Sequence, residues 1–269
     1  MEWIDPYSTQ EMIQLYLLVL CRIGPIIAFT PFLGGKLVPS PVRSGMLIVF
    51  GILFLPYATL NGAIPTGTVG FFTIFYALKE VFIGFLISFF ASIPFFVVQA
   101  SGVTIDFMRG SSQLMAQDPN LQNQASPIGI MFNYVLIALF FMVGGPERFF
   151  DAVATSFQAF PLMGGLSPEF VNLKSSLWVA IMHIIQLVFD LSLKLAAPAI
   201  IAILMAEMFL GIANRLAPQV QIAFLGMSLK SFLGLMLLFV AWYTILGEMK
   251  GLTDNMLDQI TKFFNKIPA

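Results

Sequence analysis

Two ionisable residues four positions apart lie inside a long apolar stretch of the sequence. Asp190 precedes Lys194, so on a helix the carboxylate and the ammonium share one face and can form an ion pair. The two residues form either a buried structural pair or part of a proton or ion relay, which is a common use of acids inside membranes. His183 lies seven residues before Asp190, about two helical turns away on nearly the same face. It suits either a relay or a histidine whose hydrogen bonds are satisfied at a helix interface.

Three more ionisable residues lie near the end of this stretch or in the last one. Glu207 is followed eight residues later by Arg215, and the two can pair across a turn. Lys230 lies two to three turns inside its stretch. Its ammonium either reaches the nearer membrane interface or pairs with an acid on another chain.

Charged residues also interrupt the earlier apolar stretches, namely Arg22 and the neighbours Lys79 and Glu80. A charge at the centre of a bilayer costs at least ~2.5–3.5 kcal/mol. The number of such residues therefore indicates helices that face protein, or a water-filled path, more than lipid.

The composition is that of a polytopic membrane protein. Hydrophobic residues make up 58% of the 269 residues and charged residues only 10%, whereas a soluble domain carries about 25% charged residues. The length allows several membrane spans but no second large soluble domain, so we expect one membrane domain over residues 1–269. The net charge of −1 indicates neither a nucleic-acid partner nor a polybasic anchor. Acidic residues precede the first apolar stretch, which is not the pattern of a cleaved signal peptide.

The sequence contains no signature of an enzyme, a cofactor site or a metal site. The single cysteine, Cys21, excludes an intrachain disulfide. The single histidine, His183, excludes the usual His/Cys metal constellations. Residues 226–230 come nearest to a G-x-S-x-G nucleophile motif but lack its second glycine, and neither H-E-x-x-H nor a P-loop occurs. We therefore expect no enzymatic activity, no cofactor and no bound metal.

The apolar pattern predicts an all-α membrane protein built from helical hairpins and broken helices. Residues 71–98 form either one long helix or two pieces broken at Pro94. Residues 177–211 are too many for one crossing of a ~30 Å bilayer core, which favours a hairpin or a broken helix. The tail, residues 247–269, has the apolar spacing of an amphipathic helix on a surface. The other expected segments are residues 14–32, 46–60, 128–143, 147–160 and 222–246.

The only extended polar stretch is residues 99–127. It cannot face lipid, because its backbone groups would be unsatisfied there. It is therefore an aqueous loop or a re-entrant segment buried in protein. Gly110 gives it flexibility, and Met108 and Met115 give it soft apolar bulk. These properties suit a plug that yields to a passing chain, and the alternative is an ordinary connecting loop.

Two blocks of sequence carry a family resemblance. The first contains residues 102–106, Arg109-Gly110-Ser111 and Asp118-Pro119. The second contains Ala197-Pro198, Glu207, residues 210–219 with the sequence LGIANRLAPQ, and residues 225–230 with the sequence LGMSLK. Together they resemble the T-subunit family of type III secretion export apparatuses (SctT, SpaR and YscT), whose flagellar relative is FliR. The resemblance covers nearly the whole chain, and its Asp106 … Arg109-Gly110 form is more similar to the virulence injectisome branch.

The resemblance implies a non-enzymatic, multi-pass subunit of an export gate. Such a subunit lies in the bacterial inner membrane, within the basal body of the secretion system. In that family one copy joins several copies of P/R-type and Q/S-type membrane subunits around a protein-conducting channel. Secreted proteins pass through the channel, and an export switch subunit packs around the outside.

The resemblance also assigns roles to residues of this chain. In the family, the loop after the third apolar region contributes to closing the channel. The corresponding plug or gate residues here are Phe107, Met108, Arg109, Gly110 and Met115. The residues expected to pair with sister subunits, or with one another within the membrane, are Asp190, Lys194, Glu207, Arg215 and Lys230.

The competing interpretation is a secondary transporter or ion channel with a relay of Asp190, His183 and Glu207. Transporters usually contain two related halves with matching broken helices. We find no internal repeat in this sequence, so the pattern favours the export-gate subunit.

Overall fold

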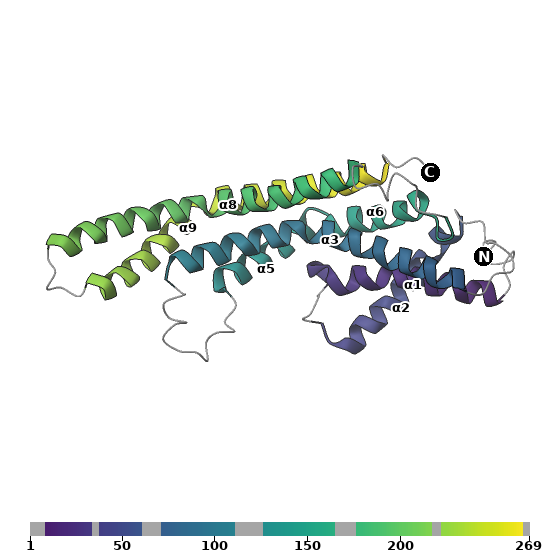
Figure 1. Ribbon diagram of the computed structural model, residues 1–269. Coiled ribbons are helices and arrows are strands. Elements are labelled where there is room, and N and C mark those ends of the chain that lie inside the picture. Colours follow the sequence, from purple (N-terminus) through teal and green to yellow (C-terminus); the bar gives the residue numbers. More distant parts are fainter. Residues whose placement is uncertain are drawn as a thin grey trace. The chain divides into compact units, whose positions relative to one another are not determined.

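The computed structural model describes residues 9–33, 38–60, 71–110, 126–164, 176–216 and 222–265. These ranges are mainly helical, with short turns, and contain no strand (Figure 1). The helices are α1 (Thr9–Phe29), the 3-10 helix η1 (Pro31–Leu33), α2 (Ser40–Leu60), α3 (Phe71–Met108), α5 (Pro127–Met142), α6 (Gly145–Ala159), α8 (Ser176–Leu216) and α9 (Ile222–Asn265).

The prediction of an all-α polytopic membrane protein is confirmed. Within the described ranges, five helices are long and apolar enough to cross a membrane. The number rises to six if α5 and α6, which are separated by a short turn, together make one broken span. Gly144 in this turn has a φ of 74°, a left-handed conformation that glycine adopts without steric cost.

The chain divides into two compact units. The first consists of Met1–Ile93, Gly144–Ala180 and Asp254–Ala269, and the second of Pro94–Val143 and Ile181–Thr253. The first unit thus contains α1, α2 and α6 with the first part of α3. The second contains the end of α3 and all of α5, together with most of α8 and α9.

The first unit is held together by aromatic packing and by one very close helix contact. Helix α1 packs on α2, and α2 packs on α6. The rings of Phe54 and Phe157 stack with centroids 6.2 Å apart. On α3, a Cβ atom added to Gly84 would lie 2.1 Å from the carbonyl oxygen of Arg22. Only glycine therefore allows α1 and α3 to approach so closely.

The second unit joins the end of α3 to α5, α8 and α9. The rings of Phe95 on α3 and Phe140 on α5 lie edge to face at 6.0 Å. Helices α8 and α9 run antiparallel as neighbours (Figure 1). Where they meet, a Cβ atom on Gly226 would lie 3.0 Å from Leu210.

Helix α3 corrects the prediction for the polar stretch. It runs unbroken through Pro94 to Met108, so the first ten residues of the stretch 99–127 are helical. The hydroxyl groups of Ser101 and Thr104 donate to the carbonyl oxygens of Val98 and Ala100 at 2.7 and 2.8 Å. The helix thus satisfies these polar side chains internally, and a polar composition did not require a loop.

Helix α8 corrects a second prediction. It is one helix of 41 residues that continues through Pro198, so the hairpin or broken helix expected for residues 177–211 is wrong. The prediction assumed that bilayer thickness limits helix length. One face of α8 is buried within the chain instead, through small and branched residues that include Leu195, Ala199 and Ile203.

The described part of the tail, through Asn265, is helical and continues α9 instead of forming a separate helix. Helix α9 runs for 44 residues without a break at Gly247 or Gly251. The apolar side chains of Met249, Leu257 and Ile260 are buried within the chain. Part of the apolar face expected for the tail is therefore covered by the chain itself.

Candidate functional site

A polar cluster joins the end of α3 to the start of α5. The carboxylate of Asp106 is almost fully buried and accepts three hydrogen bonds. The donors are Nη1 of Arg109 at 3.1 Å, the hydroxyl of Ser126, and the backbone N–H of Ile128 at 3.0 Å. Ser126 is the N-cap of α5, and its oxygen also accepts from the backbone N–H of Gly129 at 2.9 Å. Asp106 thus accepts a hydrogen bond from one of the backbone N–H groups at the N-terminus of α5, which have no partner within that helix.

The backbones of α3 and α5 are in direct contact beside this cluster. A Cβ atom on Gly102 would lie 2.4 Å from both Cα and N of Gly129. Any larger side chain at Gly102 would therefore separate the two helices. Since α3 leads into residues 111–125 and α5 follows them, both ends of that segment are held side by side.

Arg109 connects the same cluster to α9. Its Nη2 donates to the hydroxyl of Ser231 at 2.9 Å, while Nη1 pairs with Asp106. The aliphatic part of Arg109 lies over Gly234, where an added Cβ would be 3.2 Å from Cγ of the arginine. The same Cβ would lie 3.3 Å from Ile203 on α8. Gly234 thus leaves room for Arg109 to pack on α9, where a larger residue would press on the arginine side chain.

Helix α3 ends beside these residues through a glycine cap. Gly110 has a φ of 100°, and its N–H donates to the carbonyl oxygen of Phe107 at 3.1 Å. The side chain of Phe107 is 62% exposed, and that of Met108 is partly exposed. Of the predicted plug or gate residues, Phe107 to Gly110 therefore lie together at the helix end. Met115 lies outside the described residues.

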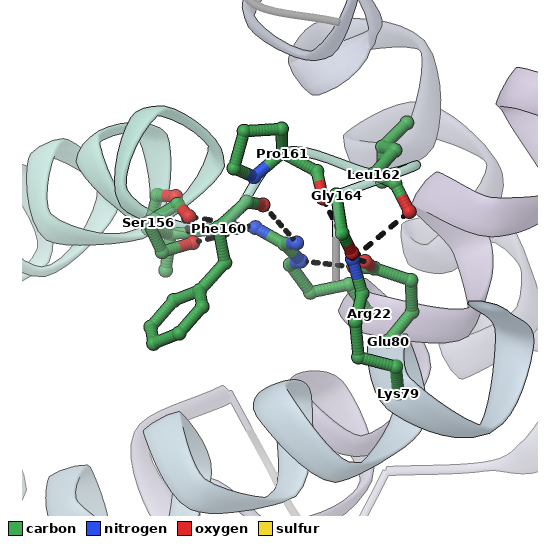
Figure 2. A network of polar contacts seen from close by, with 9 residues as sticks. Arg22, Lys79, Glu80, Ser156, Phe160, Pro161, Leu162 and Gly164 are labelled. Atoms are coloured by element: carbon green, nitrogen blue, oxygen red, sulfur yellow. Dashed lines mark hydrogen bonds and ion pairs between the residues drawn. The ribbon is translucent and has the colours of Figure 1, made fainter. Parts of the chain in front are cut away.

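The buried charges of the first unit form a separate network (Figure 2). Arg22 on α1 is completely buried, and its Nε pairs with Glu80 on α3. Its Nη1 donates to the carbonyl oxygen of Ser156 at 2.9 Å, and its Nη2 to that of Phe160 at 2.7 Å. Every nitrogen of this guanidinium is therefore used within the chain.

Lys79 holds the turn that follows α6 (Figure 2). Its ammonium donates to the carbonyl oxygens of Pro161, Leu162 and Gly164 at 2.6, 2.9 and 3.0 Å, and pairs with Glu80 at 3.0 Å. Two cations thus satisfy the free carbonyl groups at and after the C-terminus of α6, where positive charge is favoured. This arrangement is structural, and in the described part of the chain no cluster of residues could hold a metal ion.

One predicted charge pair occurs with a different partner. Lys230 on α9 pairs with Glu207 on α8, with side chains 20% and 42% exposed. The expected pairing of Glu207 with Arg215 across a turn is wrong, because α8 continues through both residues. Eight residues of helix separate them by ~12 Å.

The other predicted charges are exposed along α8. Asp190, Lys194 and Arg215 all have exposed side chains. Among the described residues, no ion pair joins Asp190 to Lys194, although they have the spacing for one. The side chain of His183 lies outside the described part of the structure.

Comparison with known proteins identifies the family. The family model for bacterial export proteins, family 1, matches residues 13–256. The chain belongs to this family. It is 27% identical to the surface presentation of antigens protein SpaR of Shigella flexneri, over 93% of this chain and 98% of that protein. It is 29% identical to the Yop proteins translocation protein T of Yersinia pestis, over 86% and 87%. It is 26% identical to the flagellar biosynthetic protein FliR of Bacillus subtilis, over 88% and 90%.

The family and the fold confirm the function that the resemblance implied. The chain is a multi-pass inner-membrane subunit of a type III secretion export gate. The transporter alternative is not favoured, because the similarity to export proteins extends over nearly the full length.

Sequence reasoning missed several residues of the α3–α5–α9 cluster. Ser126 had a usable signal, since a serine directly before a proline often caps a helix that begins there. Ser231 and Gly234 carry no such signal in the sequence, because their role depends on contact with Arg109, more than one hundred positions earlier.

Proposed function

We propose that this subunit helps to close the protein-conducting channel with the segment that joins α3 to α5. The observation that supports this is the fixed base of the segment. Asp106 and the Gly102–Gly129 contact hold its two ends together. A short segment on a rigid base can occlude a passage and be pushed aside without unfolding the helices that carry it.

The residues that act in this proposal are those at the end of α3 and in the segment itself. Phe107 and Met108 supply apolar bulk, together with Met115 further along. Gly110 ends the helix in a left-handed conformation. Arg109 anchors the segment through Asp106 and Ser231 instead of occluding the channel.

We further propose that the subunit works only in a complex and carries no enzymatic activity or cofactor. Its partners would be the P/R-type and Q/S-type membrane subunits and the export switch subunit, with secreted proteins as the transiting substrate. The exposed charges on α8 support this, since Asp190, Lys194 and Arg215 would be costly against lipid. Polar groups on neighbouring subunits would satisfy them.

Deletion of residues 111–117 tests the proposed closure in the intact apparatus. The deletion spares Arg109 and Asp106, so the base stays in place. We expect resting cells to take up a membrane-impermeant dye and to leak ions, while the complex keeps its native mass. Unchanged permeability with an assembled complex would contradict the proposal.

A further inference from the structure

We infer that the outer face of α6 borders water at the depth where α1 and α2 cross the membrane, whereas the outer face of α2 borders an apolar environment. An aqueous face of this kind lies on the first compact unit. It is independent of the proposed closure, which concerns the segment between α3 and α5.

Helix α6 lies alongside the interior of α1 and α2, and both of these helices are long and apolar enough to cross a membrane. Arg22, inside α1, donates to carbonyl oxygens in the last turn of α6 and just after it (Figure 2). Phe50, in the middle of α2, stacks on Phe150 of α6 with ring centroids 5.0 Å apart. One turn further along α2, Phe54 stacks on Phe157 at 6.2 Å. Helix α6 is therefore at the same depth as the two spans.

The side of α6 that faces away from these helices is polar. Arg148 on this side already pairs with Asp254 of α9, and both side chains stay exposed, at 50% and 37%. Among the described residues, Glu147 and Asp151 take part in no ion pair. The exposed polar side chains of this face are those of Glu147, Arg148, Asp151 and Gln158.

Contacts on the inner side fix this orientation of α6. The side chain of Phe157 is completely buried, and the guanidinium of Arg22 lies 4.2 Å from the centre of its ring. The same guanidinium donates to the hydroxyl of Ser156 at 3.2 Å. Rotation of α6 to turn its carboxylates inward would break these contacts. The polar face is therefore a fixed outer surface.

The outer face of α2 is apolar at the same depth. The side chains of Ile48, Val49, Ile52 and Leu53 are 52–63% exposed, and lipid or an apolar helix suits such a surface. Carboxylates on α6 would be costly against either neighbour. Protein interfaces are also depleted of Asp and Glu. Water is the environment that satisfies these carboxylates without a further partner, so one side of the unit is apolar and the other aqueous.

Cysteine labelling in the assembled apparatus tests the aqueous face. Cys21, the only cysteine of the chain, is first replaced by alanine, and Asp151→Cys or Gln158→Cys is then added. Ile52→Cys is the matched control, because it lies at the same depth on the exposed face of α2. A membrane-impermeant maleimide is applied to sealed membrane vesicles of both orientations. Label is counted only on chain recovered in the native complex, and two α6 positions are used in case one variant fails to assemble.

We expect Asp151→Cys and Gln158→Cys to react from one side of the membrane severalfold faster than Ile52→Cys, because the reactive thiolate forms in water. All three should react equally after denaturation in detergent. Two results would overturn the inference. One is an α6 face that reacts only after denaturation, which would show that lipid or another subunit covers it. The other is equal labelling of Ile52→Cys in the native complex, which would show that the two faces do not differ.

Discussion

Gly102 on α3 and Gly129 on α5 lie so close that a Cβ on the first would sit 2.4 Å from the backbone of the second. This contact sets the spacing of the two helices that flank residues 111–125. It also brings Asp106, one turn further along α3, within reach of the N-terminus of α5. The relationship explains how the carboxylate of Asp106 can be buried with its hydrogen bonds satisfied.

Gly102→Ala should destabilise the subunit. The added methyl group cannot be accommodated without separating α3 from α5, and overpacking of this kind costs ~1–3 kcal/mol. The measurement is the midpoint of heat unfolding of the complex extracted in mild detergent. Gly247→Ala on α9 is the control, because a Cβ there meets nothing within 4 Å and alanine favours a helix by ~1 kcal/mol. Equal midpoints for Gly102→Ala and the unaltered protein would contradict the close contact.

Glu80→Gln should be among the most destabilising changes in the first unit. It leaves Arg22 and Lys79 buried without a counter-charge, and breaking a buried pair from one side costs ~3–5 kcal/mol. We expect low yields of folded subunit and loss of the assembled complex. The readout is the amount of the chain in membranes and in the native complex.

The matched control for Glu80→Gln is Asp254→Asn. The carboxylate of Asp254 also forms an ion pair, with Arg148, but the two side chains are 37% and 50% exposed, and exposed pairs contribute only ~0–1 kcal/mol. Its yield should stay near that of the unaltered protein. Similar yields for the two variants would show that the buried network is not essential for folding.

Asp190→Asn distinguishes a subunit interface from a relay. If Asp190 faces a polar group of a neighbouring subunit, the variant should assemble poorly or export less protein, with no change in the transport of small solutes. The measurement combines native mass with the amount of a secreted protein in the medium. Normal assembly and normal export would show that Asp190 makes no pairing contact that matters.

The sequence predicted the fold class and several helix limits for physical reasons. The break between α5 and α6 was evident because Gly144, Gly145 and Pro146 follow one another. The helix ends at Met108 and Leu216 were not predicted. Composition could not reveal that hydroxyl groups would bond within α3, or that packing would extend α8 beyond the thickness of a bilayer.

The site was predictable only in part. Sequence spacing identified Asp190 and Lys194 as a possible pair, but the structure leaves both exposed and joins Glu207 to Lys230 instead. Pairs that are distant in sequence depend on how helices pack, and local spacing carries no information about that. The family resemblance pointed to Arg109 and its neighbours as site residues. Only the structure showed that Arg109 donates a hydrogen bond to Ser231.

The most direct test of the account is the native mass and composition of the tagged chain, extracted in mild detergent from its own host. We expect a large complex that contains this chain together with two other small polytopic membrane proteins, each in excess over it. A monomer or a small homo-oligomer would contradict the central claim that the chain works as a subunit of an export gate.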